Sequence, residues 1–417
     1  MSRARRSSSH ARPSISALPG RSRSRTTSNP PAPGRFDFGL SAEDEARAER
    51  LHRESIIVDY VAQGPGGRIF DHYPPELRSE IQERIDAQED VWAKLAVAES
   101  SLYELWERGT SSLVKEWMEQ SGLTCGVFAA PVGDDPVFRR WDALSARTTN
   151  VPWRRRVTTA EEIRRAKRDG VIAAYGYWQP VAPIPRGLDA LDDAYDRGLR
   201  ICMLTYNRMD NVGVGCTERV DAGLSNHGIS VVRRLNELGV IVDVSHCGPA
   251  TTLDACRFST KPVTANHTAA RAVYPHARGK TDEALEAIAY TGGVVGVLCV
   301  PAFVTDASPP TIEHMLDHVD YIAALVGWEH VGIGTDWPNT APVAVLRSIL
   351  SPTAAANTDL GFRDQDRLDV TRNLVGFDDV RDFPNITRGL VKRGYSDEQI
   401  RGILGENALR VFADVCG

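Results

Sequence analysis

The sequence lacks the features that mark membrane, disulfide-rich and nucleic-acid-binding proteins. No apolar run approaches the roughly 18 residues that a membrane-spanning helix needs, so no membrane partner is expected. Seven cysteines in 417 residues are too few, and uneven in number, for a disulfide framework, which favours a reduced compartment and a cytoplasmic location. The formal net charge is −6, whereas a nucleic-acid-binding protein would normally carry an excess of positive charge.

Residues 1–38 lack the apolar material of a folded domain. The first 35 residues carry eight arginines and many serines, with Ile15 and Leu18 as the large aliphatic residues. Such a segment cannot bury enough surface to fold, and it has no apolar core of a secretory signal. We interpret it as a disordered tail, with an Arg- and Ser-rich organellar transit peptide as the alternative. Residues 39–417 are expected to form one domain.

From Ser55 onward, short apolar runs alternate with helix-like segments. Most runs are almost continuously apolar, which is typical of strands buried on both faces of a parallel sheet. We interpret eight runs as strands, namely Ile56–Val61, Leu123–Ala130, Gly170–Trp178, Leu199–Asn207, Gly239–His246, Pro262–His267, Gly292–Val300 and His330–Trp337. The pattern predicts the α/β class and a (β/α)₈ TIM barrel, with a doubly wound open sheet as the alternative. Residues 64–122 are too long for a simple crossover and are expected to form a helical insertion after strand one.

Two histidines and an aspartate close three of the predicted strands. In a barrel of this kind the carboxyl ends of the strands meet at one mouth, so His246, His267 and Asp336 are expected to converge there. Imidazole and carboxylate groups are the usual ligands of catalytic zinc, which keeps one position open for water. A lone histidine at a strand end is more often a structural group, but two at consecutive strand ends, with an aspartate at the last strand, favour a site.

Several motifs follow one another in order between Ser55 and Phe412. They are Gly239–His246, Pro262–Val273, Arg278 with Asp282, Gly292–Val295, Val331–Asp336, Phe383–Leu390 and Leu404–Phe412. In this combination the sequence resembles the membrane (renal) dipeptidase family of zinc hydrolases, within the amidohydrolase-like barrels. The resemblance implies two neighbouring zinc ions in the family's site, with His246 and His267 on one of them. It also implies that Asp336 acts in proton transfer, that Arg278 holds the substrate carboxylate, and that the chain forms a homodimer.

Four polar positions of the family's site are changed in this chain. The strand-one His-x-Asp pair reads Val61 and Gln63, the bridging strand-three Glu reads Gln179, and the strand-four His reads Tyr206. With Asp336 as the remaining carboxylate, two adjacent divalent ions would lack charge compensation. We therefore expect at most one zinc ion on the two histidines, completed by Gln179, Asp336 or water, or no metal at all.

Three hypotheses about function follow. The first is a dipeptidase-like metallohydrolase that cleaves a dipeptide or another small amide with a carboxylate. The second is a metal-independent acid/base enzyme, a lyase or isomerase, on the same barrel, and the third is a non-catalytic ligand-binding homologue. In the first, Asp336, Tyr206 and Gln179 are the candidate catalytic residues. Arg278 and Tyr206 are the candidate substrate-binding residues, and we expect Arg278 to matter for ligand binding rather than for folding.

Overall fold

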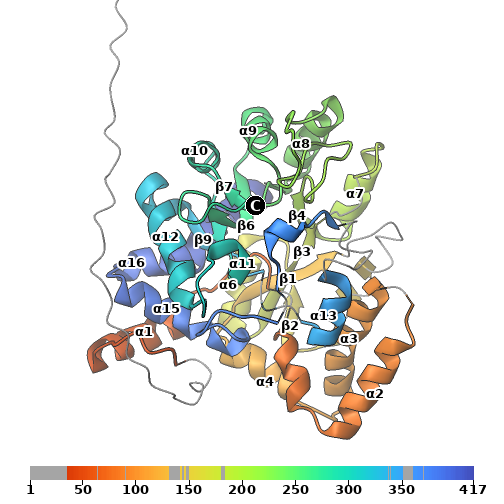
Figure 1. Cartoon of the computed structure of the whole chain (residues 1–417), viewed down its shortest axis with the longest axis vertical. Helices are drawn as coiled ribbons and strands as arrows, with labels where there is room; N and C mark the ends of the chain where they lie inside the picture. Colours follow the sequence, from red (N-terminus) through yellow and green to blue (C-terminus); the bar gives the residue numbers. More distant parts are fainter. Residues whose placement is uncertain are drawn as a thin grey trace, which may run out of the picture. The chain divides into compact units, whose positions relative to one another are not determined.

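The computed structural model describes most of the chain after residue 34. The described residues are 35–62, 64–89, 91–130, 141–142, 145–146, 150–179, 184–336, 338, 340–350, 360–369 and 371–417. Figure 1 shows strands in the middle of this part, with helices packed around them. Gln63 and Trp337, which close two of the expected runs, lie outside the described residues.

A parallel sheet curls into the expected barrel. Its strand order is β1-β3-β4-β5-β6-β8-β9, and each neighbouring pair is parallel. The strands are β1 (Cys125–Ala130), β3 (Ile172–Trp178), β4 (Leu199–Met203), β5 (Ile241–Asp243), β6 (Val263–Ala270), β8 (Val295–Val297) and β9 (Val331–Ile333). Two short strands, β2 (Arg154–Arg156) and β7 (Gly279–Lys280), pair with β3 and β6.

The first predicted strand closes the ring between β1 and β9. Val58 forms a parallel bridge with Cys125 of β1, and Asp59 forms one with Ile333 of β9. The backbone N–H of Asp59 donates to the carbonyl of Cys125, and that of Tyr60 donates to the carbonyl of Ile333, each at 3.0 Å. The segment around Asp59 therefore takes the first of eight strand positions, and the predicted α/β barrel is confirmed.

The alternation of side chains along the strands separates two apolar layers. In β3, Ala173, Tyr175 and Tyr177 belong to one buried cluster, whereas Ala174 and Trp178 belong to the other. Successive side chains of a strand point to opposite faces of the sheet, so alternate residues of β3 pack into different layers. Because both layers are apolar, the strands have no solvent-exposed face, which is why their sequences read as continuous apolar runs.

Helices cover the outside of the barrel. Those that follow the strands are α6 (Ala160–Asp169), α7 (Asp189–Asp196), α8 (Asn226–Leu238), α9 (Pro249–Phe258), α10 (Asp282–Tyr290), α11 (Pro301–Val304), α12 (Ile312–Val326) and α13 (Val343–Leu350). The chain ends with α15 (Pro384–Lys392), α16 (Asp397–Arg401), a π-helical turn over Gly402–Glu406, and α17 (Asn407–Cys416). Helix α8 begins after Ser225, whose hydroxyl accepts from the N–H of Gly228, and it ends at Gly239 in the left-handed conformation, as a C-terminal glycine predicts.

The insertion after the first strand is helical, as expected. A 3₁₀ turn over Gly67–His72 leads to α2 (Pro75–Asp86), α3 (Val91–Glu107) and α4 (Leu113–Gln120). In Figure 1 these helices lie together to one side of the barrel. Leu102, Leu105 and Trp117 are buried there, so the insertion adds to the apolar core.

The N-terminal part of the described chain packs against the C-terminal helices. Phe38 is 5% exposed, and its ring lies T-shaped against Phe36 at 4.8 Å between centroids. The N–H of Phe36 donates to Asn385 of α15 at 3.1 Å, ahead of α1 (Ala42–Glu54). The expected boundary at residue 38 is therefore wrong by a few residues, because Phe36 and Phe38 bury apolar surface in the folded domain. The rest of the expected tail, 1–34, lies outside the described residues.

None of the described helices is both long and apolar enough to cross a bilayer.

Candidate active site

The predicted site residues stand at the carboxyl ends of the strands. Gln179 directly follows β3, Tyr206 follows β4, His246 follows β5, His267 lies within β6, and Asp336 follows β9. Because parallel strands end at the same edge of a barrel, these positions face one mouth. The structure brings Gln179, His246 and His267 into direct contact.

The two imidazoles meet through their Nε2 atoms. These atoms are 3.0 Å apart, and the side-chain nitrogen of Gln179 lies 3.5 Å from Nε2 of His246 and 3.4 Å from Nε2 of His267. Both histidines are buried. Burial lowers the pKa of both imidazoles well below the usual value, and the positive charges of Arg278 and Lys280 lower it further. Both rings are therefore neutral at physiological pH, the state in which imidazole can bind a metal.

Tyr206 covers one face of His246. The two rings are stacked with centroids 4.0 Å apart and 19° between their planes. Burial raises the pKa of the Tyr206 hydroxyl, and the nearby carboxylate of Asp336 raises it further, so the phenol stays protonated. The tyrosine is thus placed beside the histidine pair as a possible proton donor, and its ring also fixes the plane of the imidazole.

Two other buried carboxylates join neighbouring strands near the mouth of the barrel by hydrogen bonds. Asp59 accepts from the N–H of Thr335 at 3.1 Å and from its hydroxyl at 2.6 Å, which ties strand one to the end of β9. Asp243 accepts from the Tyr177 hydroxyl at 2.7 Å and from the N–H of Asn266 at 3.0 Å, which ties β5 to β3 and β6. Burial raises the pKa of both carboxyls, and these hydrogen bonds oppose the rise. They hold strand ends in place rather than face a ligand.

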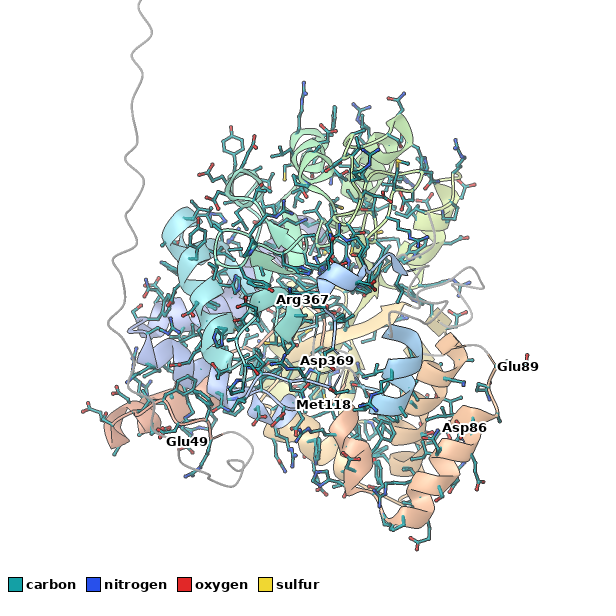
Figure 2. All side chains as sticks on the ribbon, in the orientation of Figure 1. Glu49, Asp86, Glu89, Met118, Arg367 and Asp369 are labelled. Atoms are coloured by element: carbon teal, nitrogen blue, oxygen red, sulfur yellow. The ribbon has the colours of Figure 1, made fainter. Side chains whose placement is uncertain are left out.

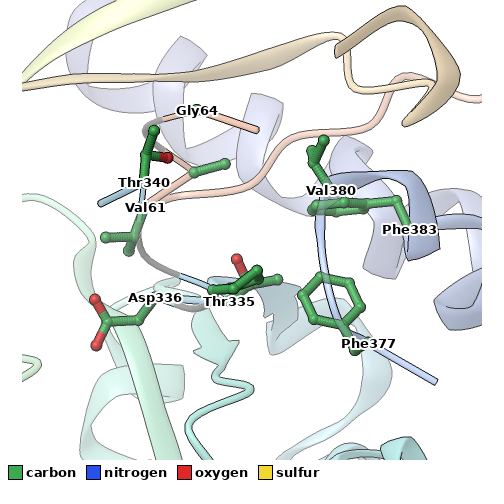
Figure 3. Close-up of a pocket in the computed structure, with 10 residues that line it drawn as sticks. Val61, Gly64, Thr335, Asp336, Thr340, Phe377, Val380 and Phe383 are labelled. Carbon is green, nitrogen blue, oxygen red and sulfur yellow. The ribbon is translucent and has the colours of Figure 1, made fainter. Parts of the chain in front are cut away.

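Asp336 lies in a pocket beside Val61, the strand-one position at which the family resemblance implies a metal ligand. Its backbone is in the left-handed region, with φ of 53°, which turns the chain sharply after β9. Val61, Asp336, Phe377 and Phe383 line the same pocket, of about 20 Å³, and in Figure 3 the carboxylate points away from the two phenylalanines. Burial raises the pKa of Asp336 to about 7. Arg278 opposes that rise, whereas neighbouring carboxylates add to it.

Arg278 is buried and links two neighbouring strands by hydrogen bonds. The expectation that it matters little for folding is therefore wrong. The residue is 1% exposed. Its Nη1 donates to the carbonyl of Ser245 at 2.6 Å, and its Nη2 donates to the carbonyl of His267 at 2.9 Å. Its Nε has no hydrogen-bond partner among the described residues. The guanidinium therefore stabilises the ends of β5 and β6 at the same time as it places a positive charge beneath the histidines.

Lys280 is a second buried cation that the sequence analysis did not single out. Its Nζ donates to the carbonyls of Val244 and Cys247, each at 2.6 Å, and to the hydroxyl of Thr252 at 3.2 Å. Burial lowers the pKa of this amine to about 8. The sequence gives little sign of this, because a lysine just before a helix is usually a surface residue.

The segment 360–369 lies over the strand-four side of the mouth. Asn207 donates to the carbonyl of Leu360 at 2.9 Å, and Arg363 donates to the carbonyl of Thr217 at 2.9 Å. Phe362 contacts the Tyr206 ring edge-on, with centroids 6.3 Å apart. Figure 2 places Arg367 and Asp369, at the end of this segment, near the middle of the view.

The side chains present fit one metal ion better than two. With metal–nitrogen distances of about 2.0–2.1 Å, two nitrogens 3.0 Å apart can share a single zinc ion, and Gln179 could add its amide oxygen. Among the described residues, however, no three His, Cys, Asp or Glu side chains converge to hold a metal. A second ion does not fit these residues, because Val61 offers no donor atom at the strand-one position.

A sequence model of a known family matches this chain over residues 140–347 and 366–416, and its description reads membrane dipeptidase, peptidase family M19. These segments make up more than half of the chain. The chain belongs to the membrane dipeptidase family.

One curated protein and two solved structures resemble this chain. The chain is 30% identical to Dipeptidase verJ of Clonostachys rogersoniana over 259 residues, which span 62% of this chain and 59% of that protein. A solved amidohydrolase from Pseudomonas aeruginosa superposes with a TM-score of 0.67 and 25% identity, covering 89% of this chain and 99% of the other. The probable dipeptidase PvdM of Pseudomonas aeruginosa, at 20% identity, superposes with a TM-score of 0.64 over 90% and 99% of the two chains. The fold of the dipeptidase family thus extends over most of this chain.

Sequence reasoning identified the histidine pair but missed its immediate supports. Asn207, whose side-chain oxygen lies 2.7 Å from Nδ1 of His246, closes the fourth predicted strand next to Tyr206. Its position at a strand end was the available signal. Lys280 left no such signal, because its burial depends on packing between β7 and the loop after β5.

Proposed function

We propose that the protein hydrolyses an amide bond in a dipeptide or another small substrate that carries a carboxylate, with at most one zinc ion held by His246 and His267. The observation that carries the proposal is the 3.0 Å separation of the two Nε2 atoms beside Gln179, in a chain of the membrane dipeptidase family. A zinc ion held there supplies Lewis acidity to a carbonyl oxygen. The apolar Val61 supports a single ion rather than two.

The chain's own residues supply the remaining chemistry. A carboxyl with a pKa of about 7 accepts and returns a proton near neutral pH, which gives Asp336 the role of acid/base group. Tyr206 keeps its phenol proton beside His246 and takes the place of an oxyanion donor. Arg278 and Lys280 add two buried positive charges beneath the histidine pair, and these favour a substrate with a carboxylate.

Metal content and hydrolysis together test this proposal. The protein would be purified without chelator and without added zinc, its metals counted by elemental analysis, and plain dipeptides offered as substrates. We expect no more than one zinc ion per chain and slow cleavage of plain dipeptides, because a single ion cannot stabilise the attacking and the leaving atoms together as two neighbouring ions do. Two tightly held zinc ions with rapid dipeptide turnover would contradict the proposal.

A metal-independent acid/base enzyme is the second candidate. The buried cations favour it, since Arg278 and Lys280 disfavour any further positive charge at the histidines. Chelation distinguishes the two candidates. If the zinc proposal holds, activity disappears with chelator and returns with zinc, whereas a metal-independent enzyme keeps its activity throughout and loses it in Asp336→Asn.

A further inference from the structure

The amide of Asn207 is oriented by a carbonyl group. Its Nδ2 lies 2.9 Å from the carbonyl oxygen of Leu360, and a carbonyl oxygen can only accept a hydrogen bond. The side-chain oxygen of Asn207 therefore faces Nδ1 of His246, at 2.7 Å. The thiol of Cys216, 3.5 Å away, donates to the same oxygen. Both neighbours thus require the same orientation of the amide.

This orientation determines which nitrogen of His246 carries the proton. An amide oxygen only accepts, so Nδ1 of His246 must donate, and the neutral ring then has an unprotonated Nε2. That lone pair points at Nε2 of His267, 3.0 Å away. His267 completes the scheme as the donor through its own Nε2, since its Nδ1 has no hydrogen-bond partner in the described part of the chain.

The position of Leu360 depends on an unusual glycine. Gly361 has a φ of 75°, and a Cβ at this position would lie 3.1 Å from Cβ of Asn207 and 2.7 Å from Cγ of Arg208. The segment 360–369 can therefore approach Asn207 closely because residue 361 has no side chain. A second link holds the same segment, since Arg363 binds the carbonyl of Thr217 and its guanidinium pairs with Asp366.

We propose that Asn207 is a positioning residue that holds His246 as the Nδ1–H tautomer, and that the segment 360–369 controls this tautomer through the carbonyl of Leu360. When the segment withdraws, the amide loses the acceptor that orients it and can rotate to offer its N–H to Nδ1. The imidazole proton then moves to Nε2, and the lone pair at the mouth is lost. The importance of that lone pair for catalysis rests on the proposed function, whereas the tautomer itself does not.

The tautomer can be read directly in metal-free protein. Histidine labelled with ¹⁵N in the ring would be incorporated, and two-bond ¹H–¹⁵N spectra recorded at one pH for the wild type and for Asn207→Leu, with His246→Asn used for assignment. We expect a protonated Nδ1 in the wild type and a protonated Nε2 in most molecules of Asn207→Leu. In the same variant, zinc or cobalt affinity should fall on the order of 10–100-fold. An unchanged tautomer in Asn207→Leu would overturn the proposal.

Asn211→Leu is the matched control for that variant. Asn211 lies in the same loop and also donates to a backbone carbonyl, that of Ile184, at 2.9 Å. Within the described part of the chain its side chain forms no hydrogen bond with either histidine, so the variant should keep the wild-type tautomer and metal affinity. A shift of the tautomer in Asn211→Leu as large as in Asn207→Leu would show that the effect is general loosening of the loop, and would overturn the specific role of Asn207.

Gly361→Ala tests the contribution of the segment. The added methyl group pushes Leu360 away from Asn207, so the Nε2–H form should appear, while Gln365→Ala, an exposed change in the same segment, should leave the tautomer unchanged. The double variant Asn207→Asp/Gly361→Ala should restore the wild-type tautomer of His246. A carboxylate only accepts hydrogen bonds, so the proton of His246 stays on Nδ1 wherever the segment lies. A wild-type tautomer in Gly361→Ala, or no rescue in the double variant, would contradict control by the segment.

These results separate the present inference from the proposed function. If the wild type binds no zinc and cleaves no amide, the proposed function fails, yet the tautomer of the metal-free protein still decides the role of Asn207. If zinc binds and hydrolysis occurs with an unchanged tautomer in Asn207→Leu, only the present inference fails.

Discussion

At the scale of single residues, Arg278 combines two roles that are usually held by different side chains. Its two Nη groups bind carbonyls at the ends of β5 and β6, and its charge lowers the pKa of His246, His267 and Asp336. Removal of this buried guanidinium leaves the two carbonyl oxygens without hydrogen-bond donors. Each buried acceptor left without a donor costs about 1–3 kcal/mol of stability.

Arg278→Lys should therefore destabilise the protein as well as alter the site. A lysine has one nitrogen and cannot reach two carbonyls in a fixed fork, so we expect a loss of about 2–4 kcal/mol in the free energy of unfolding. Urea denaturation of the variant measures this, with Arg372→Lys, a partly exposed arginine at a distance from the histidines, as the control. An unfolding midpoint equal to the wild type would show that the two hydrogen bonds are not needed for folding.

Asp336 should make stability depend on pH in the acid to neutral range. Burial raises its pKa from 3.8 to about 7, so between these values the unfolded chain releases a proton that the folded protein retains. The contribution of Asp336 to stability is fully present below about pH 4 and is lost as the pH rises through 7.

The variant Asp336→Asn removes this dependence. Its stability relative to the wild type should improve between pH 5 and pH 8 by about 1–2 kcal/mol, a value reduced from the full shift because the side chain is partly exposed. Paired urea titrations at the two pH values measure the difference. A difference between the two proteins that stays constant with pH would contradict a raised pKa at Asp336.

Lys280 should weaken metal binding at the histidine pair. Its charge lowers the pKa of both imidazoles, and for the same electrostatic reason it disfavours a cation at their Nε2 atoms. Lys280→Met should therefore bind cobalt or zinc several-fold more tightly than the wild type, as measured by titration of the cobalt absorption band. Lys261→Met, at the surface between α9 and β6, serves as the control. Weaker binding in Lys280→Met would mean that the amine supports the geometry of the site more than its charge opposes the metal.

At the scale of elements, the first strand closes the barrel but offers no metal-binding atom at residue 61. It keeps Asp59 and its bonds to Thr335, so it still closes the barrel between β1 and β9. Its next positions carry Val61 and Gln63 where the family's ligands are expected. Closure of the barrel therefore does not require metal-binding side chains at these two positions.

Restoring the family's ligands should restore metal content. The combined substitutions Val61→His, Gln63→Asp and Gln179→Glu add an imidazole and two carboxylates, which compensate the charge of a second ion. We expect the zinc content to rise from at most one towards two ions per chain, as measured by elemental analysis after dialysis. A zinc content that stays at the wild-type level would show that the strand-one positions do not face the histidine pair.

The elements could be predicted well from the sequence, and the contacts between side chains less well. Continuous apolar runs identified each barrel strand, because a strand covered on both faces has no polar alternation to confuse it with a surface strand. Strand ends then placed His246 and His267 at one mouth. The burial of Arg278 and Lys280 could not be predicted, because it depends on which carbonyls the loop after β5 presents to β7. The link from Asn207 to Leu360 joins residues 153 positions apart, and no local pattern records it.

At the scale of the whole domain, the two ends of the described chain stabilise each other. Helix α1 packs along α15, and Arg388 of α15 forms an ion pair with Glu45 of α1 and donates to the carbonyl of Phe36 at 2.8 Å. Phe38 contacts this helix as well, since its ring lies beneath the Arg388 guanidinium at 5.6 Å. Folding of the barrel is thus completed by residues that precede its first strand.

Phe38→Ala should therefore lower the stability of the entire domain. A buried phenylalanine that is truncated to alanine costs about 3–5 kcal/mol, and the loss should shift the single thermal transition rather than create a second one. Calorimetry measures both features, with Val343→Ala, a partly exposed apolar residue, as the control. A transition at the wild-type temperature would mean that the residues before α1 are dispensable for folding.

The buried amine of Lys280 also affects how easily a second metal ion could be engineered into this site. Each added ligand at residues 61, 63 or 179 attracts a cation, yet the benefit is reduced as long as Lys280 and Arg278 remain beneath the histidines. Arg278 cannot be given up easily, because it also supports two strand ends. Exchange of Lys280 should therefore increase the gain in metal affinity that each of these ligand substitutions gives.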